Sequence, residues 1–187
     1  MLLDGSKGLE PQTRSLFEVC RLRKLPLFTF VNKMDMNALS PMEIIDQIEN
    51  EFGLQTIPVS WPIGDGDRFK GVYSRIDKKC YLYEKNTKRG QRAIVTKIDP
   101  VDERDKLEAA IGDDQLFVQF YEDLELIEGA IDEIDVEKVL NQEQTPLFFG
   151  SALIDFGVSE FLDYFLCNCY FHAVNSGELS ECCVGTR

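Results

Sequence analysis

The feature that most constrains the fold is a short apolar run that ends in a polar loop. Residues 27–31 read Leu-Phe-Thr-Phe-Val, with Pro26 before them and Asn-Lys-Met-Asp at 32–35 directly after them. A run that is apolar on both faces is typical of a strand in a parallel sheet covered by helices on both sides. Because open α/β sheets bind ligands at the carboxyl ends of their strands, the sequence predicts an α/β fold with a ligand site at residues 32–35.

The polar loop has the chemistry to recognise guanine. The carboxylate of Asp35 can accept hydrogen bonds from both N1 and N2 of the base, a bidentate pair that adenine cannot supply. The aliphatic part of Lys33 can cover the base, and Asn32 can connect the base to neighbouring loops. Such a site rejects a ligand without the matching donors by about 10⁴-fold. Four residues alone also match an ordinary solvated turn, so the hypothesis needs a second signal.

The second signal is a strand and turn at residues 145–153, which read Thr-Pro-Leu-Phe-Phe-Gly-Ser-Ala-Leu. Gly150, followed by two small residues, allows backbone N–H groups to approach a ligand closely. An ordinary strand-to-helix turn has the same composition and would be the simpler explanation of this segment alone. Both segments together, in this order, favour a nucleotide-binding domain.

These segments resemble the G domain of translational GTPases, from residue 1 to about residue 166. The resemblance rests on residues 32–35 and on three further stretches, Ser-Pro-Met-Glu at 40–43, Trp-Pro-Ile-Gly at 61–64 and Phe-Phe-Gly-Ser-Ala-Leu at 148–153. Within the family the pattern is closer to the peptide-chain release factors, with elongation factor G as the alternative. The resemblance implies a backbone N–H from the Ser-Ala turn to the guanine carbonyl. The implied guanine-binding residues are Asn32, Lys33, Asp35, Ser151, Ala152 and Leu153.

The resemblance also implies a function. The nucleotide is GTP or GDP, with Mg²⁺ in full-length members of the family, and GTP is used on the ribosome to recycle class I release factors in translation termination. The implied partners are the ribosome and those release factors.

Two motifs of the family are missing from this sequence, which contains neither G-x-x-x-x-G-K-[ST] nor D-x-x-G. The first holds the nucleotide phosphates, and the second senses the γ-phosphate and Mg²⁺. We therefore expect a partial G domain that begins inside the domain, has no catalytic residue and no metal ligand, and is inactive as a GTPase by itself. A non-catalytic module that contacts the ribosome and an inactive truncation product are the alternatives.

The expected architecture is an α/β, P-loop-type G-domain fragment that carries an α+β insertion. The core occupies residues 1–60 and returns as a strand and helix at 145–166, and the insertion occupies 61–144. Antiparallel strands are expected at 56–63, 69–76, 80–84 and 91–98, followed by helices at 102–111, 114–128 and 135–141. With its neighbouring strands missing, strand 27–31 is expected to have an open edge or an uncovered face.

Two further helices are expected to pack on the core through particular side chains. A helix over residues 11–24 should do so through Leu16, Val19 and Cys20. The last helix should face the sheet through four apolar residues, Val158, Phe161, Leu162 and Phe165. Between them, Ser40 and Glu43 form a capping box with Pro41 at the first helical position, and Gly53 ends that helix.

Charge is distributed unevenly along the chain. Residues 99–143 carry sixteen acidic and three basic side chains, whereas residues 68–97 carry ten Lys and Arg against two acidic ones. Two solvated faces would produce this pattern, and so would two blocks that pair with each other in the fold. The functional alternative is that 68–97 contacts RNA or an acidic ribosomal stalk protein.

The segment 167–187 does not resemble the family. It contains four of the six cysteines and the only histidine, and a zinc site could draw on Cys167, Cys169, His172, Cys182 and Cys183. Their spacing differs from the C-x₂₋₄-C of structural zinc sites, so we expect a disordered tail without a metal.

The remaining sequence indicates where the protein is located. Only two cysteines lie outside the tail, which suits a reducing compartment. No apolar run approaches the roughly 20 residues that span a membrane. We expect a cytoplasmic protein with neither a membrane nor DNA as a partner.

Overall fold

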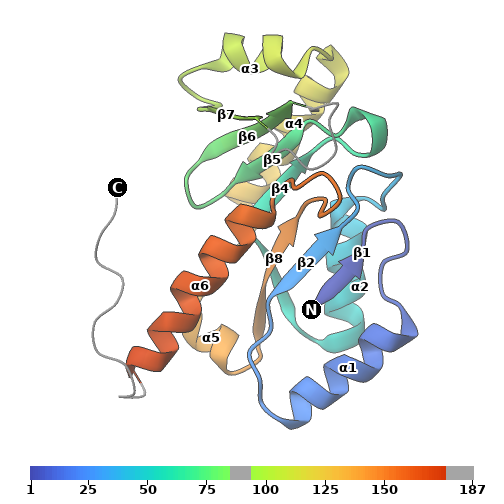
Figure 1. The fold of residues 1–187 in the computed structure, drawn as a ribbon, viewed down its shortest axis with the longest axis vertical. Coiled ribbons are helices and arrows are strands. Elements are labelled where there is room, and N and C mark those ends of the chain that lie inside the picture. The colour runs from blue at the N-terminus through green and yellow to red at the C-terminus, as the bar shows by residue number, and fades with distance from the viewer. Residues whose placement is uncertain (85–93, 176–187) are drawn as a thin grey trace.

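The computed structural model describes residues 1–84 and 94–175, with backbone only at residues 84, 94 and 168–175. In these residues it contains two four-stranded sheets and six α-helices (Figure 1). The elements of the first sheet and its helices are β1 Leu2–Asp4, α1 Pro11–Leu22, β2 Thr29–Asn32, α2 Pro41–Phe52, β3 Gln55–Pro58, α5 Val136–Leu140, β8 Gln144–Phe149 and α6 Val158–Asn175. The remaining elements are β4 Ser60–Ile63, the short 3₁₀ helix Gly66–Arg68, β5 Gly71–Ser74, β6 Lys79–Glu84, β7 Ile94–Ile98, α3 Arg104–Ile111 and α4 Asp114–Gly129.

The first sheet is entirely parallel, with the strand order β1-β2-β8-β3. Successive side chains of its strands point to opposite faces. Val31 and Phe149 pack in the core that includes residues of α1 and α2, while Phe30 and Phe148 pack against Phe161 of α6. Helices thus cover both faces, and the expected α/β class is confirmed.

The expectation that strand 27–31 has an open edge or an uncovered face is wrong. β2 is an inner strand, because β1 pairs with one edge and β8 with the other. Thr29, inside β2, is fully buried and its hydroxyl hydrogen-bonds that of Thr145 at 2.9 Å. The edge strands are β3 and β1, and β1 is only three residues long, with Leu2 64% exposed.

Helix α1 packs on the core through Cys20, as expected, but its buried residue is Phe17 and not Leu16 or Val19. Phe17 is buried and stacks on Phe52 of α2, with 3.9 Å between ring centroids. Leu16 and Val19 are exposed, and Cys20 is half-buried. The large flat ring of Phe17 buries more apolar area against α2 than the aliphatic side chains would, so it determines the rotation of the helix.

Helix α2 has the ends that its sequence predicts. Ser40 accepts a hydrogen bond from the N–H of Glu43, whose side chain accepts one from the N–H of Ser40. Pro41 is at the first helical position, and Gly53 ends the helix in the left-handed conformation at φ 65°. Four residues of this helix are buried, namely Ile44, Ile45, Ile48 and Phe52.

The second sheet, β4–β7, is antiparallel in the order β4-β5-β6-β7. Together with α3 and α4 it forms the upper part of Figure 1. The expected strand at 56–63 is in fact two strands. β3 pairs in parallel with β8 in the first sheet, and after Val59 the chain continues as β4 in the second sheet. Residues 91–93 of the expected strand 91–98 lie outside the described residues, and the boundaries at 61 and 144 stay a prediction.

The two sheets share one core. Trp61 of β4 is 1% exposed and lies edge-on to Phe149 of β8 at 5.9 Å. The hydroxyl of Ser60 accepts a hydrogen bond from the N–H of Phe149 at 2.9 Å. A single cluster of buried residues therefore extends from Leu3 in the first sheet to Ile127 in α4.

Helix α6 lies along the first sheet and extends beyond residue 166. Phe161 packs as expected, and Phe165 keeps an edge contact with Phe28 at 5.2 Å although it is 37% exposed. Leu162 is 47% exposed, so its expected packing is wrong. The helical backbone continues to Asn175, so the predicted disorder does not describe residues 167–175; residues 176–187 lie outside the description. No helix among the described residues is long and apolar enough to cross a membrane.

Candidate guanine-recognition site

The carboxyl ends of β2 and β8 bring the two predicted segments together. We call residues 32–35 the recognition loop and residues 150–157 the recognition turn. The N–H of Gly150 donates to the carbonyl of Val31 at 3.0 Å, and the N–H of Met34 donates to the carbonyl of Gly150 at 3.1 Å. These two backbone hydrogen bonds fix the loop against the turn although the segments are far apart in sequence.

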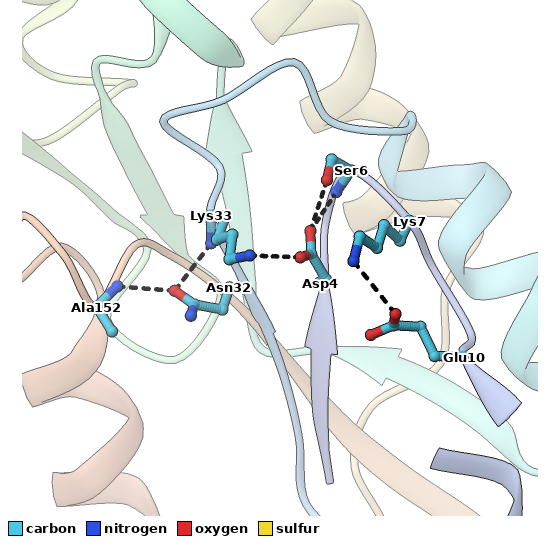
Figure 2. Close-up of polar contacts among 7 residues, drawn as sticks. All are labelled: Asp4, Ser6, Lys7, Glu10, Asn32, Lys33 and Ala152. Carbon is cyan, nitrogen blue, oxygen red and sulfur yellow. Dashed lines mark hydrogen bonds and ion pairs between the residues drawn. The ribbon is translucent and has the colours of Figure 1, made fainter. Parts of the chain in front are cut away.

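Asn32 ties the loop to the turn through its side chain. Its Oδ1 accepts hydrogen bonds from the backbone N–H of Lys33 and from that of Ala152, both at 2.8 Å (Figure 2). One of the two N–H groups of the Ser-Ala turn, that of Ala152, is thus directed at Asn32 in this structure. The next residue, Leu153, has a side chain that is 81% exposed.

Lys33 lies between β2 and β1 and pairs with an acidic residue that the sequence did not single out. Its backbone is left-handed, with φ 70°, and its Nζ lies 2.6 Å from Oδ2 of Asp4 (Figure 2). Asp4 also accepts hydrogen bonds from the backbone N–H and the hydroxyl of Ser6 at 3.0 and 2.7 Å. The hydrogen bond from Lys33 is the main cause that lowers the pKa of Asp4 to about 2, and the same pair raises the pKa of Lys33.

The position of Asp4 could have been found from the sequence. It is the last residue of β1 and lies directly beside Asn32 in the parallel register. A carboxylate at the end of a neighbouring parallel strand is at the same edge of the sheet as the recognition loop. The missing step was to place the strand at residues 2–4 beside residues 29–32.

Two buried oxygen atoms of this site have no hydrogen-bond partner among the described residues. They are Oδ1 of Asp35 and the hydroxyl oxygen of Ser151, and the only other such atom there is Nε of Arg75. The residue Ser151 is fully buried. A buried polar atom without a partner costs roughly 1–3 kcal/mol, so the two atoms mark a place where a polar ligand would be stabilising.

The recognition turn has a backbone that only glycine permits at its start. The N–H of Ser151 donates to the carbonyl of Phe156, and the N–H of Phe156 donates back to Ser151, both at 2.9 Å. A Cβ on Gly150 would lie 2.2 Å from the carbonyl oxygen of Phe156. The glycine therefore allows the close approach that holds Ser151 and Ala152 beside the loop.

One cavity lies away from the six predicted guanine-binding residues. A cavity of about 650 Å³ between the second sheet and α6 is lined by Tyr81, Tyr83, Phe148 and Tyr164 among others, and by none of the six predicted guanine-binding residues. Its walls are mostly apolar side chains. We place the site by the partnerless oxygen atoms and the loop geometry, because these match the chemistry of a base, and not by the size of the cavity.

The described residues do not supply a metal site. No group of three or more His, Cys, Asp or Glu among them could hold a metal ion. Of the cysteine and histidine cluster considered for zinc, only Cys167 has a described side chain, and it is exposed and free.

The fold and the site define a class of protein. The profile of the family described as Elongation factor Tu GTP binding domain matches residues 1–169, and the chain belongs to this family. The expected G-domain class is therefore confirmed.

Comparison with individual relatives shows which branch of this family the chain resembles. The chain is 50% identical over 166 residues to Peptide chain release factor 3 of Acaryochloris marina and 52% identical over 166 residues to that of Gloeothece citriformis. Peptide chain release factor 3 of Trichodesmium erythraeum is 50% identical over 170 residues. In each case 89% of this chain is covered but only 30% of the relative. The resemblance to the release factor branch is thus confirmed, for a chain that spans about 30% of the length of these relatives.

Proposed function

We propose that this chain is the guanine-recognition part of a translational GTPase of the release factor 3 type. The observation that carries the proposal is that Asp35 in the recognition loop and Ser151 in the recognition turn each have a buried oxygen atom without a partner, in two segments that hydrogen-bond to each other where two parallel strands end. Guanine supplies two donors, N1–H and N2–H, that match a carboxylate. Adenine supplies no such pair.

The other residues of the site position this carboxylate and the base. Asn32 holds the loop against the turn and so places Ser151, Ala152 and Leu153 near the base carbonyl. Because the N–H groups of Ser151 and Ala152 already donate to Phe156 and Asn32, one of them must share or change its acceptor to reach that carbonyl. The pair with Asp4 fixes the end of Lys33, which leaves its aliphatic part to cover one face of the base. In this arrangement the whole site acts by hydrogen bonding and shape, without a chemical step.

The phosphates and Mg²⁺ of a nucleotide do not have a matching site in the described residues. The sequence lacks the motif that holds phosphates, and phosphate contacts supply much of the binding free energy of nucleotides in this architecture. We therefore expect GTP and guanosine to bind the 187-residue chain with similar, weak affinities. We also expect no phosphate release above buffer, with or without ribosomes.

The activity and partners of the longer relatives are part of the proposal. GTP hydrolysis on the ribosome, recycling of class I release factors and contact with the acidic stalk through residues 68–97 are proposed for the longer protein to which this segment corresponds. Three basic side chains of 68–97 have acidic partners within the fold, which supports the self-complementary explanation for part of the charge pattern. Arg68 pairs with Asp113 at 3.0 Å, and both Arg75 and Lys78 pair with Glu128.

The test is a comparison of nucleosides with the full chain. Guanosine, inosine and adenosine are titrated into ¹⁵N-labelled protein while the amide signals of Asp35 and Ala152 are followed. Guanosine should shift both signals, inosine should bind about tenfold more weakly because it lacks N2–H, and adenosine should shift neither. Equal responses to adenosine and guanosine would refute guanine recognition, and submicromolar binding of GTP would refute the weak-affinity expectation.

A further inference from the structure

The recognition turn is attached to the second sheet by one tyrosine. The hydroxyl of Tyr83, on β6, accepts a hydrogen bond from the N–H of Gly157 at 2.9 Å and donates to Oε2 of Glu160 at 3.2 Å. Its ring stacks on Phe156, with 4.0 Å between centroids and 16° between planes. Phe156 is 1% exposed and also packs against Phe69, just before β5. The far end of the turn is thus attached to β6 in addition to its contacts with residues at the end of β8.

The recognition loop is attached to the second sheet as well. The N–H of Gly66, in the segment after β4, lies 2.9 Å from the carbonyl of Met34 and 3.1 Å from that of Met36. Gly66 has a φ of 54°, and a Cβ there would lie 3.0 Å from Oδ1 of Asn37. The second sheet, through Tyr83 of β6, and the 3₁₀ helix that follows β4, through Gly66, therefore contact the two segments of the site.

We propose that the second sheet positions the guanine site, with Tyr83 as the positioning residue for the turn and Gly66 as that for the loop. The inference rests on the proposed function, because it concerns the same site. Neither residue is among those proposed to contact the base. Both act through backbone groups of the segments that do.

Hydrogen bonds between residues that are adjacent along the turn connect Tyr83 to Asn32. Gly157 donates to Tyr83, the adjacent Phe156 exchanges two hydrogen bonds with Ser151, and the adjacent Ala152 donates to Asn32. Without the hydroxyl, the buried N–H of Gly157 has lost its acceptor, and the turn must shift to expose it to water. The shift moves Ser151 and Ala152 relative to Asp35, and base binding weakens.

The test compares Tyr83→Phe with a matched control, Tyr81→Phe, in the full chain. Tyr81 lies two residues earlier on the same strand, and its hydroxyl donates to Asp77 and not to the turn. Both variants lose one hydroxyl and keep the ring. In the chain without ligand, hydrogen exchange at the amides of Gly157, Ser151 and Ala152 should become about tenfold faster in Tyr83→Phe and remain unchanged in Tyr81→Phe.

The second measurement is guanosine affinity, determined from the folded-state signals so that a fraction of unfolded chain does not alter it. Tyr83→Phe should weaken guanosine and inosine by the same factor, about fivefold to tenfold, because the turn is proposed to face the carbonyl that both bases carry. The preference for guanosine over inosine, which depends on Asp35, should stay.

The possible failures are distinguishable. Exchange at the turn that is unchanged in Tyr83→Phe, or equally faster in both variants, overturns the positioning role, whatever the nucleosides do. Unchanged guanosine affinity despite faster exchange overturns it too. If the unmodified chain gives no guanosine response, the proposed function fails, and positioning of a guanine site fails with it, while the exchange data still decide whether Tyr83 holds the turn.

Discussion

Buried polar side chains near the two sheets differ in whether they have hydrogen-bond partners within the protein. Around the second sheet, two buried aromatic side chains have partners on α4, since Trp61 donates to Asp123 at 3.1 Å and Tyr73 donates to Glu128 at 3.1 Å. Among the described residues there, only Nε of Arg75 is a buried side-chain atom without a hydrogen-bond partner. At the carboxyl ends of the first sheet, Asp35 and Ser151 each keep a buried oxygen atom without a partner. The acidic side chains of α4 thus act as internal partners of the second sheet, whereas Asp35, which follows β2, has a buried oxygen atom for which we propose a ligand as partner.

The largest expected effect concerns Arg75, which belongs to the internally paired region. Its side chain is 8% exposed, pairs with Glu128 and donates to the carbonyls of Pro58 and Ile131. Arg75→Ala leaves these acceptors buried and should lower the free energy of unfolding by about 3 kcal/mol, measured by urea denaturation. The exposed pair of Arg14 with Glu51 is the control, since Arg14→Ala should cost less than about 1 kcal/mol. Similar losses in the two variants would contradict the assignment.

The second largest expected effect is the loss of guanosine affinity when the carboxylate of Asp35 is removed, without a loss of stability. Asp35→Ala should reduce guanosine affinity at least about a hundredfold, since it removes both acceptors for the base. The free energy of unfolding should stay the same or rise, because a buried oxygen without a partner is removed. Nucleoside titration and urea denaturation give the two values, with exposed Asp46→Ala as the control. A loss of more than about 2 kcal/mol in stability would show that Asp35 is structural.

A substitution of Asp123 should have the reverse effect, with lower stability and no change in guanosine affinity. Asp123→Ala removes the acceptor of the Trp61 indole N–H and should lower the free energy of unfolding by about 1–2 kcal/mol. Guanosine affinity should not change. Trp61 is the only tryptophan, so its fluorescence during urea denaturation reports this stability directly. If Asp123→Ala is as stable as the original chain, Asp123 is not an internal partner that holds the second sheet, and the proposed difference from Asp35 is contradicted.

The smallest effect is a pH dependence at the edge of the site. The pKa of Asp4 falls from its ordinary 3.8 to about 2, mainly through Lys33. A lowered carboxyl pKa contributes stability that is present above about pH 4 and lost as the pH falls through about 2. Because the Lys33 side chain is 46% exposed, solvent screening should keep the contribution below about 1 kcal/mol. Denaturation of Asp4→Asn beside the original chain should show the full difference above about pH 4 and a decreasing one as the pH falls toward 2; an equal difference at pH 2 would contradict the ion-pair explanation.

The sequence predicted the elements whose cause is local. The capping box at Ser40, the left-handed Gly53 and the apolar strand before Asn32 each depend on a few neighbouring residues, and each is present. The two segments of the site were also found, because each follows a strand and parallel strands end at one edge. Their roles in binding stay a prediction.

The sequence did not predict the features that depend on distant partners. Which face of α1 is buried follows from the stacking of Phe17 on Phe52, and helical spacing alone could not choose between that ring and Leu16. The inner position of β2 depends on β1, a strand too short to be recognised by its period. The role inferred for Tyr83 depends on a contact that spans 74 residues, for which the sequence gives no periodic signal.

The place of β8 in the first sheet has a consequence for biosynthesis. Thr29 and Thr145 meet across β2 and β8 although they are 116 residues apart, and Asn32 and Ala152 are 120 residues apart. Closing such long separations is slow, and it requires that the later strand has left the ribosome. A nascent chain that already displays the recognition loop still lacks the turn, so the capacity to discriminate between purines should be acquired late in synthesis, after the second sheet has been made.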